Sequence, residues 1–194
     1  LELGFGRGKV EELCDEQGPI GVQLFDHRPD AMADAARRAE DAGAFLIDIN
    51  MGCPVRKIAR KGGGSGLIRD PHLASRIIEA VANAVRLPVT VKTRLGWCGS
   101  DAAPQTWCRH LQNAGAQLLT LHGRTREQGF KGKADWAAIA AVKQALTIPV
   151  IANGDINTPG DAQRCLAQTG ADGVMVGRGP MGAPVSYTHL TLPT

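Results

Sequence analysis

The chain has 194 residues, of which 43% are hydrophobic, and a formal net charge of +3. This is enough for one sizeable core, and the mild positive charge is too weak to indicate a polyanionic partner by itself. No apolar run reaches the roughly 18 residues that a membrane span needs, and no signal peptide is evident. Five cysteines without a CxxC pair favour a reducing, cytoplasmic location over a disulfide framework. Cys98, Cys108 and His110 fit no common zinc spacing, so no metal site is predicted.

Short aliphatic runs alternate with alanine-rich segments of helical periodicity along the chain. The predicted strands are 21–25, 45–50, 89–95, 118–122, 150–153 and 173–176. The predicted helices between them are 30–42, 71–84, 103–114, 136–145 and 159–168. Strict alternation of strands and helices predicts a parallel sheet, and the continuous apolar strands indicate that both of its faces are buried.

Six βα units are recognisable, whereas a closed TIM (β/α)8 barrel needs eight. Because the chain opens at Leu1 without an initiator methionine, we expect a truncated α/β barrel with its last six strands present and its first two missing. An open, doubly wound sheet is the structural alternative. We expect residues 1–184 to form the partial barrel. Residues 185–194 lack the enrichment in alanine and glycine of the rest of the chain and look like a non-native, adapter-derived tail.

Polar or reactive residues follow each predicted strand at its carboxyl end, where the catalytic groups of a TIM barrel lie. In strand order they are Gln23; Asn50 and Cys53; Lys92 and Arg94; His122 and Arg124; Asn153, Gly154 and Asp155; and Gly177 and Arg178. Because parallel strands of a barrel open on one mouth, these residues are expected to converge on a single pocket.

The last two turns have the composition of a phosphate site. TIM barrels often bind phosphate through the loops after the seventh and eighth strands, which here would be 153–155 and 177–179. Glycine allows backbone N–H groups to approach a phosphate closely, and Arg178 would add a charge-assisted hydrogen bond.

Several of these residues also have an ordinary structural interpretation. Lys92 fits either a side chain that snorkels to the rim or a cation that holds an anionic cofactor ring or substrate oxygen. His122 fits a hydrogen-bonded core histidine, and Cys53 fits a buried structural thiol. The Gly/Pro turn around Cys53, with Asn50 three residues earlier, favours a functional thiol.

The densest positive patch, Arg56, Lys57, Arg60 and Lys61, comes directly after Cys53 and before a glycine run. Beside a catalytic loop these charges are placed to meet a polyanion, although a solvated, flexible loop explains them equally well. The glycine run lacks the GxxxxGK[ST] order, so a P-loop is rejected.

Taken together, the motifs resemble those of the tRNA-dihydrouridine synthase (Dus) family. They occur in family order from about Gly18 to Pro184: Asn-x-Gly-Cys-Pro with Lys57 and the Gly-rich loop, Val-Lys-Thr-Arg-Leu-Gly, His-Gly-Arg-Thr, Ile-Ala-Asn-Gly-Asp and Val-Gly-Arg-Gly. Each motif alone is weak, but the joint match is highly specific. The segments Arg-Leu-Gly-Trp and Gly-Arg-Thr-Arg-Glu-Gln-Gly look closest to the bacterial branch called DusC.

The resemblance implies an FMN-dependent TIM barrel that uses NADPH to reduce uridine to 5,6-dihydrouridine in the tRNA D-loop. It implies that Cys53 is the proton donor and that Asn50, Arg94 and Lys57 contact the substrate. The implied flavin contacts are Gln23, Lys92, His122, Asn153, Gly154, Asp155, Gly177 and Arg178. The family's first strand and its C-terminal helical domain have no counterpart in the sequence, so a fragment of a synthase is expected. We further expect a cytoplasmic monomer with tRNA as its partner and with no membrane or metal.

Three other functions share part of this pattern. A dihydroorotate dehydrogenase-like FMN barrel would act on a small free pyrimidine instead of tRNA. A flavin-free phosphate-binding barrel would show no flavin absorption. A non-catalytic tRNA-binding barrel would bind tRNA without oxidising NADPH.

Overall fold

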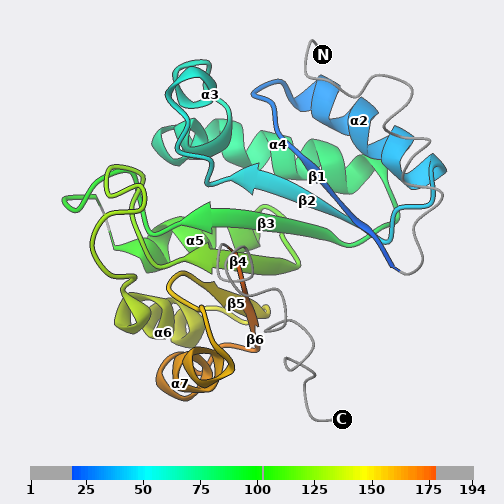
Figure 1. Cartoon of the computed structure of the whole chain (residues 1–194). Helices are drawn as coiled ribbons and strands as arrows, with labels where there is room; N and C mark the ends of the chain where they lie inside the picture. The colour runs from blue at the N-terminus through cyan, green and yellow to red at the C-terminus, as the bar shows by residue number, and fades with distance from the viewer. Residues whose placement is uncertain (1–18, 102, 178–194) are drawn as a thin grey trace.

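A computed structural model describes residues 19–101 and 103–177 of the chain. Its six strands form one sheet in which every neighbouring pair is parallel and the spatial order is the chain order (Figure 1). The strands are β1 (Gly21–Leu24), β2 (Leu46–Met51), β3 (Val89–Arg94), β4 (Leu118–His122), β5 (Val150–Asn153) and β6 (Gly173–Met175).

The helices begin and end at residues suited to those positions. They are α2 (Pro29–Asp41), α3 (Arg56–Arg60), the 3-10 helix η2 (Gly64–Arg69), α4 (Pro71–Ala84), α5 (Pro104–Asn113), α6 (Trp136–Ala145) and α7 (Pro159–Thr169). Four of them start with proline, which suits the first helical position because its missing N–H would have no intrahelical partner. The side chains of Asp70, Asp135 and Thr158 cap α4, α6 and α7.

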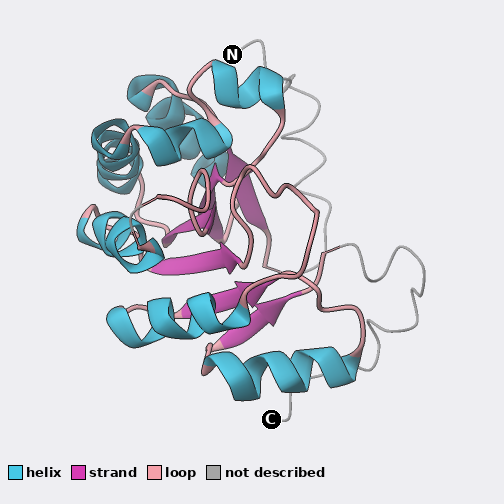
Figure 2. Ribbon diagram, turned by 90° about the vertical axis from the view of Figure 1, so that its left-hand side faces the viewer, coloured by secondary structure: helices cyan, strands magenta, loops and turns pink. Residues whose placement is uncertain are grey.

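Sequential strand order distinguishes the two candidate architectures. A doubly wound sheet reverses its strand order and carries helices on both faces. Here the order never reverses, the helices α2, α4, α5, α6 and α7 pack in succession on one another, and the helices lie on one side of the strands (Figure 2). The described residues therefore hold six of the eight strands of a TIM barrel, together with the helices that connect them, which confirms the predicted fold class.

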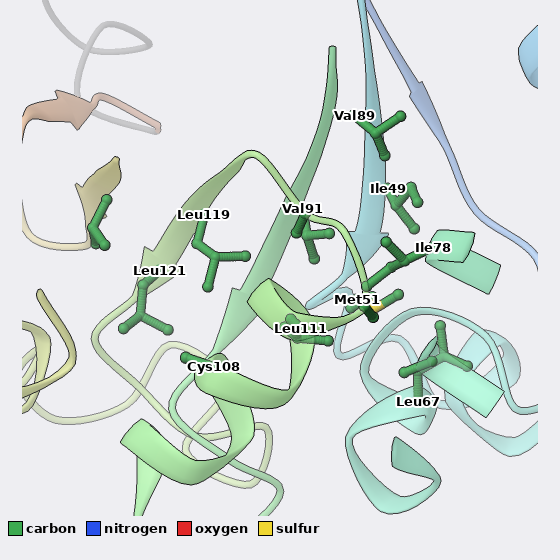
Figure 3. Packing of buried hydrophobic residues seen from close by; sticks show 14 of the residues in the cluster. Ile49, Met51, Leu67, Ile78, Val89, Val91, Cys108, Leu111, Leu119 and Leu121 are labelled. Carbon is green, nitrogen blue, oxygen red and sulfur yellow. The ribbon is translucent and has the colours of Figure 1, made fainter. Parts of the chain in front are cut away.

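The two faces of the sheet differ in chemistry because side chains alternate along each strand. Ile49, Val91 and Leu121 are fully buried and face the helices, and Figure 3 shows such strand residues gathered with Leu111 and Cys108 of α5. The opposite face is largely polar near the carboxyl ends of the strands. It carries Gln23, Asp48, Asn50, Thr90, Lys92, Arg94, Thr120, His122 and Asn153. Polar groups are costly inside a barrel unless they are hydrogen-bonded or line a site.

The predicted elements match the observed ones to within one residue at each end. The exception is the basic segment after Cys53, whose residues 56–60 form α3 and whose glycine run leads into η2. A five-residue helix is too short to show a periodicity, which is why the sequence indicated a loop. The predicted tail, 185–194, lies outside the described residues. None of the helices in the described ranges has the length and apolarity needed to cross a bilayer.

Candidate active site

A cavity of about 480 Å³ lies at the carboxyl ends of the six strands. Ten of the twelve predicted site residues line it: Gln23, Asn50, Cys53, Lys92, Arg94, His122, Asn153, Gly154, Asp155 and Gly177. Lys57 does not line the cavity and is exposed on α3. Arg178 lies outside the described residues. The structure thus brings together residues from all six strand ends, as the barrel topology predicts.

The turn that carries Cys53 is held by the Asn50 side chain. The Asn50 Oδ1 atom accepts hydrogen bonds from the Gly52 N–H at 3.1 Å and the Cys53 N–H at 2.9 Å. On the other side, the Ser65 N–H donates to the Cys53 carbonyl at 3.1 Å. Gly64, with φ +55°, leaves room where a Cβ would approach the Cys53 Cβ to 3.1 Å. The half-buried Cys53 thiol is therefore presented to the cavity by a turn fixed from two directions.

A half-buried carboxylate that the sequence analysis missed orients this turn. The Asp48 carboxylate accepts hydrogen bonds from Gln23 Nε2 at 2.7 Å and Thr90 Oγ1 at 2.8 Å. Gln23 Oε1 in turn accepts from Asn50 Nδ2 at 2.9 Å. Burial raises the pKa of Asp48 against the opposing effects of these hydrogen bonds and the Lys92 charge. The signal in the sequence is a lone acid inside an apolar strand, two residues before Asn50 and therefore on the same face.

Arg94 is a buried link between loops. It donates to the carbonyls of Gly52 at 2.8 Å, Thr125 at 3.1 Å and Gly129 at 2.9 Å. Burial, together with repulsion from Arg124, lowers its pKa to about 10. Although Arg94 lines the cavity, these three bonds go to backbone carbonyls, and they fix the loops after β2 and β4.

A second arginine fixes the wall on the β4–β5 side. Arg124 donates to the Lys131 and Gly132 carbonyls and to both oxygens of Asp155, at 2.7 and 2.9 Å. Asp155 also accepts from the Ala134 N–H at 2.7 Å and has a left-handed backbone, φ +58°. Burial alone would raise the pKa of Asp155, but the Ala134 hydrogen bond and the Arg124 charge together hold it below its ordinary value.

Burial, together with the positive charge of the cavity, keeps His122 neutral. Burial lowers the pKa of Lys92, and the nearby Arg94 lowers it further. Burial and the charges of Arg94, Lys92 and Arg124 lower the pKa of His122 to about 3. Arg124 Nη1 lies 3.4 Å from His122 Nε2, and an arginine can only donate. Nε2 is therefore the acceptor of a neutral imidazole.

We expect His122 to stay uncharged throughout the physiological pH range, which imidazole NMR shifts followed against pH will measure. The unfolded chain binds a proton near pH 6.5, so the folded state loses stability as pH falls from about 6.5 toward about 3. Replacing His122 by Asn should remove this part of the acid dependence of the urea midpoint. An imidazole that titrates near its ordinary value in the folded protein would contradict the assignment.

The fold and the cavity define the class first: a TIM-barrel protein with a cationic, thiol-bearing ligand cavity at the carboxyl face of its sheet. The dihydrouridine synthase (Dus) family model matches residues 8–192. The chain therefore belongs to the dihydrouridine synthase family.

Curated relatives agree with this family, and solved structures agree with the fold. The chain is 57% identical over 176 residues to a probable tRNA-dihydrouridine synthase 1 of Synechocystis sp., covering 91% of the chain and 50% of the relative. It is 48% identical over 169 residues to tRNA-dihydrouridine synthase B of Xanthomonas axonopodis pv. citri, covering 87% and 51%. The chain thus spans about half the length of the curated relatives it matches.

Among solved structures, a mandelate oxidase superposes with a TM-score of 0.65 at 24% identity, covering 91% of this chain and 54% of that one. A mandelate oxidase variant solved with a monooxide FMN adduct gives 0.63 at 25% identity, covering 88% and 52%. These similarities support the barrel fold. The assignment to the DusC branch stays a prediction.

Proposed function

We propose that this protein is the barrel of an FMN-dependent tRNA-dihydrouridine synthase, which reduces uridine in the tRNA D-loop with NADPH as reductant. The observation that carries the proposal is the Cys53 thiol, which opens into the same cationic cavity as Lys92 and the glycine turns. The names of the curated relatives support the reaction. The oxidase solved with an FMN adduct shares the fold and supports a flavin.

The residues of the cavity fit a flavin mononucleotide. Lys92 and the bare backbone of Gly154 and Gly177 supply positive charge and N–H groups where an anionic ring and a phosphate need them. A Cβ on Gly154 would approach the His122 ring to 2.9 Å and fill part of this space. We propose that Lys92, Asn153, Gly154 and Gly177, together with Arg178, hold the cofactor.

Cys53 is proposed to act as the general acid. A bound, reduced flavin would supply the hydride that C6 of the uracil C5=C6 bond needs. Negative charge would then develop at C5 and O4, and the Cys53 thiol would give its proton to C5. A thiol ordinarily keeps its proton at neutral pH and can therefore donate it. Lys92 would stabilise the negative charge that develops on the oxygen.

The target uridine must leave the RNA stack to reach this depth. Enzymes that act on a base extrude it into a pocket and pay the cost of unstacking from other contacts. The Asp48–Gln23–Asn50 hydrogen bonds keep the Cys53 turn in place, so the thiol need not be ordered when the base enters.

Replacing Gly154 by alanine is expected to weaken FMN binding at least tenfold. The residue has φ +114°, and the added Cβ would lie 2.9 Å from the His122 Cδ2 atom and the Ala134 Cβ atom, within the space assigned to the cofactor. Fluorescence titration of FMN measures the effect. Gly43→Ala is the matched control, because Gly43 has φ +89° and open space around it. FMN affinity that falls equally in both variants, or in neither, would contradict the placement.

Reoxidation of the reduced flavin tests the function itself. The protein is loaded with FMN, reduced with NADPH without oxygen, and mixed with unmodified tRNA transcript or with free pyrimidines. We expect tRNA to reoxidise the flavin and free pyrimidines not to. Reoxidation by a free pyrimidine would favour the dihydroorotate dehydrogenase-like alternative. A protein that binds no flavin would favour the phosphate-binding barrel. A protein that binds tRNA without oxidising NADPH would favour the non-catalytic barrel.

A further inference from the structure

A second concave surface lies beside the candidate active site. It encloses about 610 Å³ and is lined by Arg56, Ala59, Arg60, Arg69, Trp97 and Arg126. We name it the arginine–tryptophan groove. Its residues come from α3, η2 and the loops after β3 and β4. Arg56 follows Cys53 by three residues, and the Arg126 N–H donates to the Gly96 carbonyl at 2.9 Å. The groove and the cavity therefore share the loops at the carboxyl edge of the sheet.

The four arginines of the groove carry positive charge that is largely unpaired in the described part of the chain. None of them forms an ion pair or a side-chain hydrogen bond with another residue in the described part of the chain. Arg56 and Arg60 are four residues apart on α3, a spacing at which like charges repel. Asp101, a nearby acid, accepts hydrogen bonds from the Trp97 and Cys98 N–H groups and the Cys98 thiol. Its carboxylate is engaged in that turn. Burial would raise the pKa of Asp101, but these hydrogen bonds and the Arg69 charge lower it, and Asp101 acts on Arg69 only through space.

Trp97 fixes two of these arginines in place. The Arg69 and Arg126 guanidinium carbons lie over its ring at 4.9 and 4.5 Å from the centroid. Cation–π contacts of this kind orient a guanidinium while its N–H donors stay available. Arg126 Nε is buried and has no hydrogen-bond partner among the residues that the structure describes. A donor of this kind is costly to leave unpaired, so an acceptor from outside the described chain would satisfy it.

We propose that the arginine–tryptophan groove binds the phosphate backbone of the RNA strand whose uridine enters the cavity. This inference rests on the proposed function and adds the place where the substrate backbone is held. Four guanidinium groups spread over an open groove suit successive phosphates of a chain better than one small anion. The groove's position beside the Cys53 turn puts those phosphates next to the flipped nucleotide. Bound there, the backbone would hold the strand while the base is out of its stack.

The test compares RNA binding by two double variants of the full chain. R69Q/R126Q removes both arginines on Trp97, whereas R37Q/R164Q removes two exposed arginines that form ion pairs on α2 and α7. Both lose the same net charge. Fluorescence anisotropy of a labelled tRNA transcript gives the affinity across a range of salt concentrations. Each lost phosphate contact reduces the slope of log K against log salt by about 0.7 to 0.9.

We expect R69Q/R126Q to bind tRNA at least tenfold more weakly at low salt, with a slope smaller by about 1.4 to 1.8. R37Q/R164Q should stay within about twofold of the parent chain. Equal losses in the two variants, or none in R69Q/R126Q, would overturn the proposal. If R69Q/R126Q does not fold, R56Q/R60Q on the exposed face of α3 replaces it with the same expectation.

Two further measurements distinguish RNA from other ligands of the groove and the groove proposal from the proposed function. Competition by polyglutamate as strong as competition by RNA of equal charge would indicate an acidic peptide site and overturn the RNA assignment. Competition by inorganic pyrophosphate alone at low concentration would indicate a small-anion site and overturn it also. FMN binding is measured on the same samples. If R69Q/R126Q binds RNA as tightly as the parent chain while FMN binding is retained, the groove alone is rejected. If the parent chain binds RNA but not FMN, the flavin reaction alone is rejected.

Discussion

Replacing Cys53 by alanine is expected to lower uridine reduction by about 10²- to 10⁴-fold, the range that a positioned general acid contributes. FMN binding should stay within about twofold, because the Asn50 bonds that hold the turn go to backbone N–H groups and survive the change. Product formation from tRNA under saturating NADPH measures the first effect, and flavin fluorescence measures the second.

Cys98→Ala is the matched control for the loss of a half-buried thiol. Cys98 is also a free cysteine, but it does not line the cavity. This variant should retain parent activity. A Cys53→Ala protein that reduces uridine at the parent rate would refute the general-acid assignment. Equal losses in both variants would assign the effect to structure.

Replacing Arg124 by methionine is expected to destabilise the fold by about 3 kcal/mol, since it leaves a charge and several acceptors without their partner. The Arg124 side chain is 3% exposed, and its removal leaves Asp155 and the Lys131 and Gly132 carbonyls without this hydrogen-bond donor. The urea unfolding midpoint measures the loss.

Lys143→Met supplies the comparison. Lys143 also pairs with an aspartate, Asp172, at 2.7 Å, but at the surface, where such a pair contributes less than about 1 kcal/mol. An Arg124→Met protein no less stable than Lys143→Met would show that the buried link does not hold the cavity wall.

The fold and the positions of the site residues at the strand ends could be predicted from the sequence for a physical reason. Parallel strands alternate with helices, and polar or reactive residues lie at or just after the carboxyl end of the strands. The position of Cys53 or His122 along the chain therefore also fixes its place at the mouth. The same logic predicted the turn at Asn153 and Gly154. Residues 118–122 and 136–145, for example, form the predicted strand and helix with the expected bounds.

The missed features depend on register and on side-chain direction. Asp48 meets Gln23 and Thr90 only because those residues lie opposite it in the neighbouring strands. Arg94 was predicted to contact substrate, yet its visible bonds go to three loop carbonyls whose positions no local pattern specifies. Trp97 contacts Arg69 at the end of η2 and Arg126 in the loop after β4, so their proximity became visible only in the folded chain.

The central claim is that Cys53 delivers a proton to a uridine reduced in this cavity. Its most direct test is mass spectrometry of the nucleosides from a tRNA transcript treated with FMN and NADPH. The protein used is a chimera in which this chain replaces the matching half of its 57%-identical Synechocystis relative. We predict dihydrouridine, two hydrogens heavier than uridine, with the chimera and almost none with its Cys53→Ala form. Absence of dihydrouridine with the FMN-loaded chimera, or equal amounts with both forms, would contradict the account.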